Sequence, residues 1–289
     1  MTALPALGMR RDLNLGTTWL LPEWSAGPKG DEQAVLEAAL EAGYQGIQGA
    51  DPQRCRDLGL VPVTFDIRPN PGGLLARAQR WAGQGFACST LMLGSGFDDD
   101  DQCARFAEEV LEVSSAAKFP LYIETHRATI TQDIWRTLRL LERFPELRFN
   151  GDFSHWYTGH DLGATNFEES LDLLSPVLAR VRYLHGRVGA SGSIQTTVDP
   201  AALDEPPVSH FRSLWQRSFE GFLRTAGDDL VPTADRAIGF APELLPAEFG
   251  YAQLGKTAEG IEELSDRWEQ GLVLTRIASD CFWEASKRH

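Results

Sequence analysis

Short apolar runs alternate with longer amphipathic stretches along this chain. The short runs have the length of β-strands, and the longer stretches show helical patterns. The expected strands are residues 13–18, 44–48, 61–67, 89–93, 121–124, 147–152, 181–185 and 238–241. The expected helices are residues 32–41, 52–58, 72–82, 101–116, 132–143, 168–179, 210–223 and 258–287.

Eight successive strand–helix repeats predict a (β/α)8 TIM barrel, an α/β fold that usually takes about 250 residues. The chain has 289 residues, so we expect a single TIM-barrel domain over residues 1–289. The run of aspartates at 98–101 is expected to cap the helix that follows it. A calcium loop is the weaker interpretation, because an EF-hand needs spaced ligands and a terminal glutamate.

Charge and composition limit the partners of the protein. The formal net charge is −14, which disfavours nucleic acid and anionic membrane surfaces as partners, because both bind clustered basic residues. No stretch approaches the ~20 apolar residues of a membrane span. The four cysteines form no CxxC pair, which favours reduced thiols over disulfides or a zinc knuckle. We therefore expect a cytoplasmic protein, and the sequence leaves its oligomeric state open, a homo-oligomer included.

Four of the expected strands end in a carboxylate or an imidazole. Glu124, Asp152 and His185 are the last residues of theirs, and Glu243 follows the eighth. The C-terminal ends of the strands meet at one face of a barrel, where active sites lie. Three carboxylates and one imidazole would suit one divalent metal ion, Mn²⁺, Zn²⁺, Co²⁺ or Mg²⁺. The sequence thus predicts a metal site with these four ligands.

Each ligand has a less specific interpretation, which for His185 is a hydrogen-bonded histidine of the core. Either of the first two acids could cap the next helix or pair with a nearby arginine, such as Arg127 for Glu124. Glu248 is a rival to Glu243, which we prefer because it directly ends the apolar run. The conjunction of four such residues at one level of the barrel favours the metal site.

Further polar and aromatic residues follow the same strand ends. His126 and His155 are placed to bind substrate hydroxyls or to orient the ligands. Arg187 could hold a substrate oxygen or a phosphate, or form a salt bridge to one of the carboxylates. Trp156 could supply an apolar wall for a sugar.

This set of residues suits proton transfer next to a carbonyl group. A divalent ion that holds two adjacent oxygens of a hydroxy-ketone stabilises the enediolate formed when the α-proton leaves. Glu124 and Glu243 could act as base and acid on the two faces of that carbon. We therefore expect an isomerase or epimerase with a small carbohydrate as substrate. A dehydratase or lyase acting on a keto-sugar, and a carbohydrate-binding barrel without turnover, are the alternatives.

The same segments resemble the motifs of the xylose isomerase-like TIM-barrel superfamily, which includes the sugar phosphate isomerase/epimerase group. The resemblance covers nearly the whole chain and implies that the two glutamates bind the metal and exchange the proton. It also implies that Asp152 and His185 are further ligands and that His155 contacts the substrate. The segments are Glu124-Thr-His126-Arg127, Asp152-Phe-Ser-His155-Trp156, His185-Gly-Arg187-Val-Gly189 and Pro242-Glu243.

Overall fold

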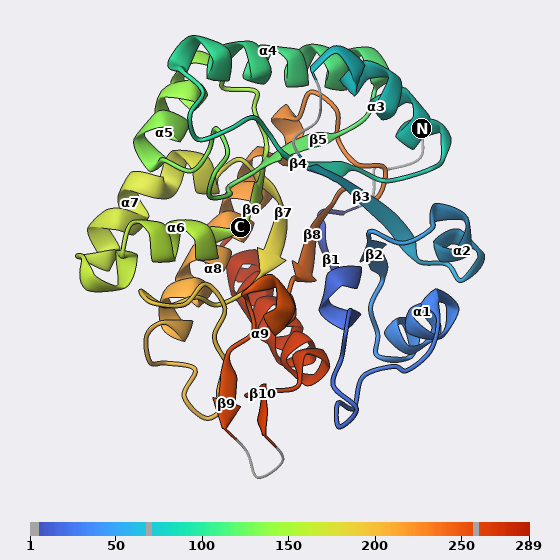
Figure 1. Ribbon diagram of the computed structural model, residues 1–289. Coiled ribbons are helices and arrows are strands. Elements are labelled where there is room, and N and C mark those ends of the chain that lie inside the picture. The colour runs from blue at the N-terminus through green and yellow to red at the C-terminus, as the bar shows by residue number, and fades with distance from the viewer. Residues whose placement is uncertain (1–5, 68–70, 257–259) are drawn as a thin grey trace.

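Eight parallel strands follow one another round a closed barrel, and β8 pairs with β1 to complete it. The computed structural model describes residues 6–67, 71–256 and 260–289, and helices surround the barrel in Figure 1. The predicted (β/α)8 barrel is confirmed. The strands are β1 (Gly8–Asn14), β2 (Gly46–Gln48), β3 (Val61–Ile67), β4 (Ser89–Met92), β5 (Leu121–Glu124), β6 (Phe149–Gly151), β7 (Val181–Gly186) and β8 (Ala237–Pro242).

Aspartate side chains accept hydrogen bonds from the first N–H groups of several helices. The predicted cap at the aspartate run is confirmed, because Asp99 and Gln102 each bond the backbone N–H of the other in a capping box. The helices are α1 (Glu32–Glu41), α2 (Pro52–Asp57), α3 (Leu74–Gly83), α4 (Asp100–Ala117), α5 (Ile134–Arg143), α6 (Phe153–Gly159), α7 (Phe167–Leu178), α8 (Val208–Thr225) and α9 (Arg267–Lys287).

The first strand lies further towards the N-terminus than expected. It ends at Asn14, whose side chain accepts a hydrogen bond from Gly16 N–H and starts a short 3-10 helix, Leu15–Thr18. The charged residues Arg10 and Asp12 make this segment look unlike a buried strand. They are nevertheless buried, because their side chains pair with each other at 2.7 Å.

The last helix is shorter than expected, and one helix was missed. The expected start of the last helix, residue 258, lies outside the described residues, and α9 begins at Arg267 after its cap, Asp266. A hairpin of β9 (Leu254–Lys256) and β10 (Ile261–Glu263) precedes it and projects at the bottom of Figure 1. The missed helix is α6, which directly follows Asp152 and is only seven residues long.

Apolar side chains fill the space between the barrel and its helices. Trp215 of α8 and Phe240 of β8 are fully buried, and their ring centroids lie 5.1 Å apart in an edge-to-face contact. All four cysteines are buried and unpaired. Within the described part of the chain, no helix has both the length and the apolar character needed to cross a membrane.

Arg267 ties α9 to the loops at the barrel mouth. Its guanidinium, on a residue only 1% exposed, bonds the carbonyl oxygens of Thr17, Trp19 and Leu20 and the carboxylate of Glu263. The hydroxyl of Thr17 in turn donates to Pro242 O and accepts from Leu244 N–H. This network fixes the backbone on both sides of Glu243.

We expect Arg267→Ala to lower the free energy of unfolding by about 3–5 kcal/mol, because it leaves a buried carboxylate and several buried carbonyls without partners. Lys287→Ala, on the same helix, is the control. Its ion pair with Glu284 is exposed, so a change within about 0.5 kcal/mol is expected. Urea unfolding followed by circular dichroism measures both, and equal stabilities of the two variants would contradict the role given to Arg267.

Candidate metal centre

The four side chains predicted as metal ligands meet at the mouth of the barrel. Each offers one ligand atom, and these atoms all lie within 4.8 Å of one another. The side chains come from the C-terminal ends of four consecutive strands, β5 to β8, as the barrel architecture requires. The residues are Glu124, Asp152, His185 and Glu243, which are 1%, 0%, 2% and 9% exposed.

The imidazole of His185 is the centre of the cluster. Its Nδ1 lies 3.3 Å from Glu243 Oε2, 3.6 Å from Glu124 Oε2 and 4.0 Å from Asp152 Oδ2. One oxygen of each carboxylate thus faces the same nitrogen atom. Three hard oxygen donors and one imidazole nitrogen form a donor set that fits a divalent cation such as Mn²⁺ or Mg²⁺.

Amide side chains on the inner face of the barrel orient these ligands. Gln48 Oε1 lies 2.8 Å from His185 Nε2 and is its hydrogen-bond partner. The other ring nitrogen, Nδ1, faces the carboxylates. Asn14 Nδ2 donates to Glu243 Oε1, and Asn150 Nδ2 donates to Glu124 Oε2. Such outer partners fix ring orientation and ligand direction in metal sites. The sequence analysis missed all three amides.

Asp152 is held by the start of α6. Its Oδ1 accepts hydrogen bonds from the backbone N–H and the hydroxyl of Ser154, so Oδ2 remains to face the cluster. The carboxylate therefore caps the helix and joins the cluster at the same time. The helix cap, one of the two interpretations that the sequence left open for this residue, is confirmed, and its role as a metal ligand stays a prediction.

Arg187 inserts a positive charge between two of the carboxylates. Its Nη2 donates to Asp152 Oδ2 and, at 3.0 Å, to Glu243 Oε2. The side chain is 1% exposed. Of the two interpretations that the sequence allowed for Arg187, the salt bridge to a carboxylate is therefore the one that the structure shows.

The charges at the cluster balance in the chain alone. Burial raises the pKa of Glu124 to about 8. Although burial opposes the charge, Glu243 and Glu124 raise the pKa of His185 to about 9. Burial also opposes the charges of Asp152 and Glu243, but Arg187 holds the pKa of Asp152 well below its usual range and His185 lowers that of Glu243. The carboxylates of Asp152 and Glu243 thus face the cations of His185 and Arg187, and burial favours the protonated form of Glu124.

Two more histidines lie beside the cluster. The ring centroids of His126 and His155 are 3.8 Å apart. Burial lowers the pKa of His126 to about 3, and burial also lowers that of His155 although Asp152 opposes the shift. Both imidazoles are therefore neutral at physiological pH and retain a lone pair.

Two other residues, Trp156 and Glu248, lie outside the cluster of four ligands. Trp156 is fully buried, and its indole N–H donates to Thr131 O, so it supports the loop after β5 and has no surface for a sugar. Thr131 O–H donates to Glu124 O, so this support extends to a ligand. Glu248 is exposed on a 3-10 turn, whereas Glu243 joins the cluster.

The ring of Tyr251, a residue that the sequence analysis missed, packs on two arginines at the barrel mouth. The guanidinium carbons of Arg187 and Arg127 lie 4.6 Å and 5.2 Å from the centroid of its ring. Arg127 thus packs on this ring, and Glu124 takes its hydrogen bond from Asn150 instead. Tyr251 lies in the long connection between β8 and α9, where no local pattern distinguishes it from its neighbours.

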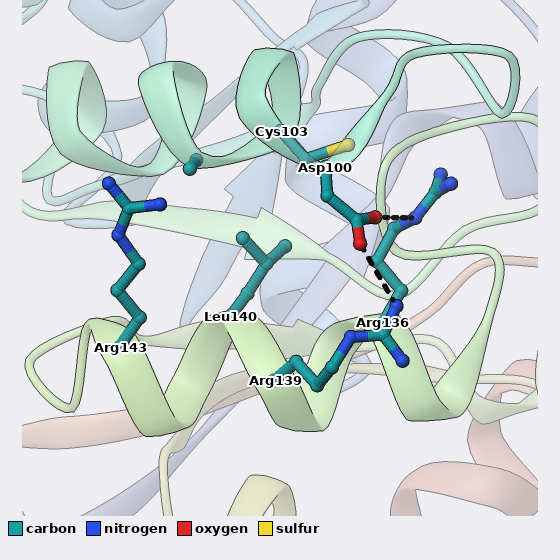
Figure 2. Close-up of a pocket in the computed structure, with 7 residues that line it drawn as sticks. Asp100, Cys103, Arg136, Arg139, Leu140 and Arg143 are labelled. Carbon is teal, nitrogen blue, oxygen red and sulfur yellow. Dashed lines mark hydrogen bonds and ion pairs between the residues drawn. The ribbon is translucent and has the colours of Figure 1, made fainter.

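A separate hollow of about 110 Å³ lies between α4 and α5 in the outer helical layer, as Figure 2 shows. There Asp100 Oδ1 lies 3.4 Å from Arg136 Nε, and Asp100 Oδ2 lies 3.3 Å from Arg139 Nη2. The neighbouring thiol of Cys103 has a pKa raised by burial, which makes it a poor nucleophile. None of the residues that line this hollow belongs to the cluster at the barrel mouth.

No protein-family model and no curated protein matches this sequence. Solved structures are similar at low identity. A xylose isomerase-like TIM barrel protein from Mycobacterium smegmatis in complex with magnesium is 13% identical, with a TM-score of 0.53 over 95% of this chain and 97% of that one. A sugar phosphate isomerase/epimerase from Parabacteroides distasonis is 11% identical, with a TM-score of 0.51 over 96% and 94%. A protein from Sinorhizobium meliloti is 14% identical, with a TM-score of 0.52 over 95% and 98%. The chain therefore has the fold of the xylose isomerase-like TIM barrels.

Proposed function

We propose that this protein is a divalent-metal-dependent isomerase or epimerase that acts on a sugar, a keto-sugar or a polyol derivative. The observation that carries the proposal is the buried cluster of three carboxylates around His185 Nδ1 at the barrel mouth. Glu124, Asp152, His185 and Glu243 would hold the ion. When bound, the ion supplies a Lewis acid for two adjacent substrate oxygens.

The two glutamates lie in different environments. Burial raises the pKa of Glu124 to about 8, whereas His185 lowers that of Glu243 although burial opposes this shift. Carboxylates that hold a divalent ion are ionised, so each can take up a proton from a carbon next to a carbonyl group and return it. They come from β5 and β8, with β6 and β7 between them, so they flank the centre from two sides. We assign Glu124 and Glu243 to the proton transfers on opposite faces of the reacting carbon.

Arg187, His126 and His155 supply hydrogen-bonding groups next to the four ligands. A guanidinium presents several N–H donors in a fixed fork, so Arg187 can bind a substrate oxygen with the donors that its carboxylates leave free. The four ligands are at most 9% exposed, and the ring of Tyr251 packs on Arg187 beside them.

The central test compares Glu243→Gln with Glu248→Gln. Removing a base in contact with the substrate costs about 10²–10⁴-fold in rate, so we expect Glu243→Gln to lower turnover about 10³-fold. Glu248 is exposed and outside the cluster, and Glu248→Gln should keep the rate of the parent protein. Thermal unfolding of both variants controls for misfolding. A loss of turnover in Glu248→Gln alone would show that the wrong glutamate has been assigned.

Deuterium exchange tests the reaction class. In heavy water with Mn²⁺, Co²⁺, Mg²⁺ or Zn²⁺, a panel of ketopentoses, ketohexoses and their phosphates should gain deuterium on the carbon next to the carbonyl group. Mass spectrometry measures the label, and the same experiment detects loss of water as the mark of a dehydratase. Metal-loaded protein that labels no member of a broad panel would favour a carbohydrate-binding barrel.

Metal affinity is expected to rise with pH. A carboxylic acid and an imidazolium must each lose a proton before they bind a metal. With pKa values of about 8 for Glu124 and about 9 for His185, a cation competes with two protons below pH 8 and with neither well above pH 9. Chelator competition with Mn²⁺ should therefore show affinity rising roughly ten- to hundredfold per pH unit below pH 8 and levelling off above pH 9. An affinity that does not change with pH would contradict this proton competition.

A further inference from the structure

A second group of ligand atoms lies beside the first at the barrel mouth. Glu124, His126 and His155 each offer one ligand atom, and these atoms also lie within 4.8 Å of one another. Glu124 belongs to both groups. It ends β5, His126 follows in the next loop, and His155 lies in the first turn of α6.

Two of the three side chains carry a buried atom without a partner. Among the described residues, Glu124 Oε1 and His155 Nδ1 are buried and form no hydrogen bond. The residues that carry them are 1% and 3% exposed. A buried polar atom without a partner costs about 1–3 kcal/mol, so an occupant that satisfies both atoms would remove that cost. The other oxygen of the same carboxylate, Oε2, faces His185 in the first cluster.

Each imidazole is also oriented by its other nitrogen. His126 Nδ1 lies 2.5 Å from Arg127 O, and His155 Nε2 lies 3.4 Å from Asp152 Oδ2 and 3.5 Å from Arg187 Nη2. A proton on His126 Nδ1, donated to Arg127 O, and one on His155 Nε2, donated to Asp152, leave lone pairs on His126 Nε2 and His155 Nδ1. Histidine ligands in metal sites are usually held in this way, with the second ring nitrogen bonded to a carbonyl or a carboxylate.

We propose that Glu124, His126 and His155 form a second divalent-cation site, joined to the first by the two oxygens of Glu124. The inference rests on the proposed function, because the first cluster must also hold an ion. One carboxylate and two imidazoles make a softer donor set than three carboxylates and one imidazole. Such a set suits Zn²⁺ or Fe²⁺ and leaves positions open for water or a substrate oxygen. With this cation bound, His126 and His155 would each bind it through one ring nitrogen, and Arg187 would remain the hydrogen-bond donor to substrate oxygens.

Metal stoichiometry tests the second site. Metal-free protein is equilibrated with Zn²⁺, and the bound metal per chain is measured by elemental analysis. We expect two ions in the parent protein and one in the double variant His126→Ala/His155→Ala. His160→Ala is the matched control, because His160 follows α6, contacts Gln132 O and belongs to neither group of ligands. It should keep two ions, and thermal unfolding of all three proteins checks that they are folded.

Mn²⁺ electron paramagnetic resonance tests whether the two ions share a ligand. Two Mn²⁺ ions bridged by one carboxylate give an exchange-coupled spectrum, and the double histidine variant should give the spectrum of an isolated ion. Two Zn²⁺ ions that persist in the double variant would mean an adventitious ion elsewhere and would overturn the second site. One ion in both proteins would overturn the second site and leave the first intact. No bound ion in the parent protein would overturn the first site as well, so the two failures are distinguishable.

Discussion

Three carboxylates buried within one small volume need positive charge, and the structure of the barrel mouth depends on this constraint. Two like charges about 4 Å apart repel by roughly 4 kcal/mol at the effective dielectric constant of a protein. In the chain alone the repulsion is relieved by the charges of His185 and Arg187 and by the proton of Glu124, whose pKa is raised to about 8. The site is therefore close to neutral, although each of its members is ionisable.

The position of the cluster follows from the barrel. Parallel strands bring their C-terminal ends to one face, and strands hold side chains more rigidly than loops do. Asn14, Gln48 and Asn150 then fix the ligands from within the barrel. The outer contacts come from Arg267, which binds the loops around Glu243, and from Trp156, which binds the loop after Glu124. Distant parts of the chain thus hold the direction of each ligand atom.

The fold and the four clustered residues Glu124, Asp152, His185 and Glu243 could be predicted from the sequence, because strand ends are visible as breaks in apolar runs. The hydrogen-bond partners of Asn14, Gln48 and Asn150 could not be predicted, because they depend on the register between strands that are far apart in the sequence. Trp156 was placed wrongly for a local reason. It follows His155 within a helix, where neighbouring side chains point about 100° apart, so one faces the cluster and the other the core. Tyr251 lies in a connection whose path no local pattern predicts.

Charge also restricts what a loaded centre would bind. With one divalent ion, the three carboxylates are balanced by the ion and Arg187, provided that Glu124 and His185 have lost their protons. A second ion on Glu124, His126 and His155 adds two positive charges and no further carboxylate, because both added ligands are neutral imidazoles. That surplus favours a bound hydroxide, a phosphate or the oxyanion of an enediolate, each of which is stabilised by nearby cations. The second site would therefore strengthen binding of the reacting anion more than that of a neutral sugar, which is the difference on which catalysis depends.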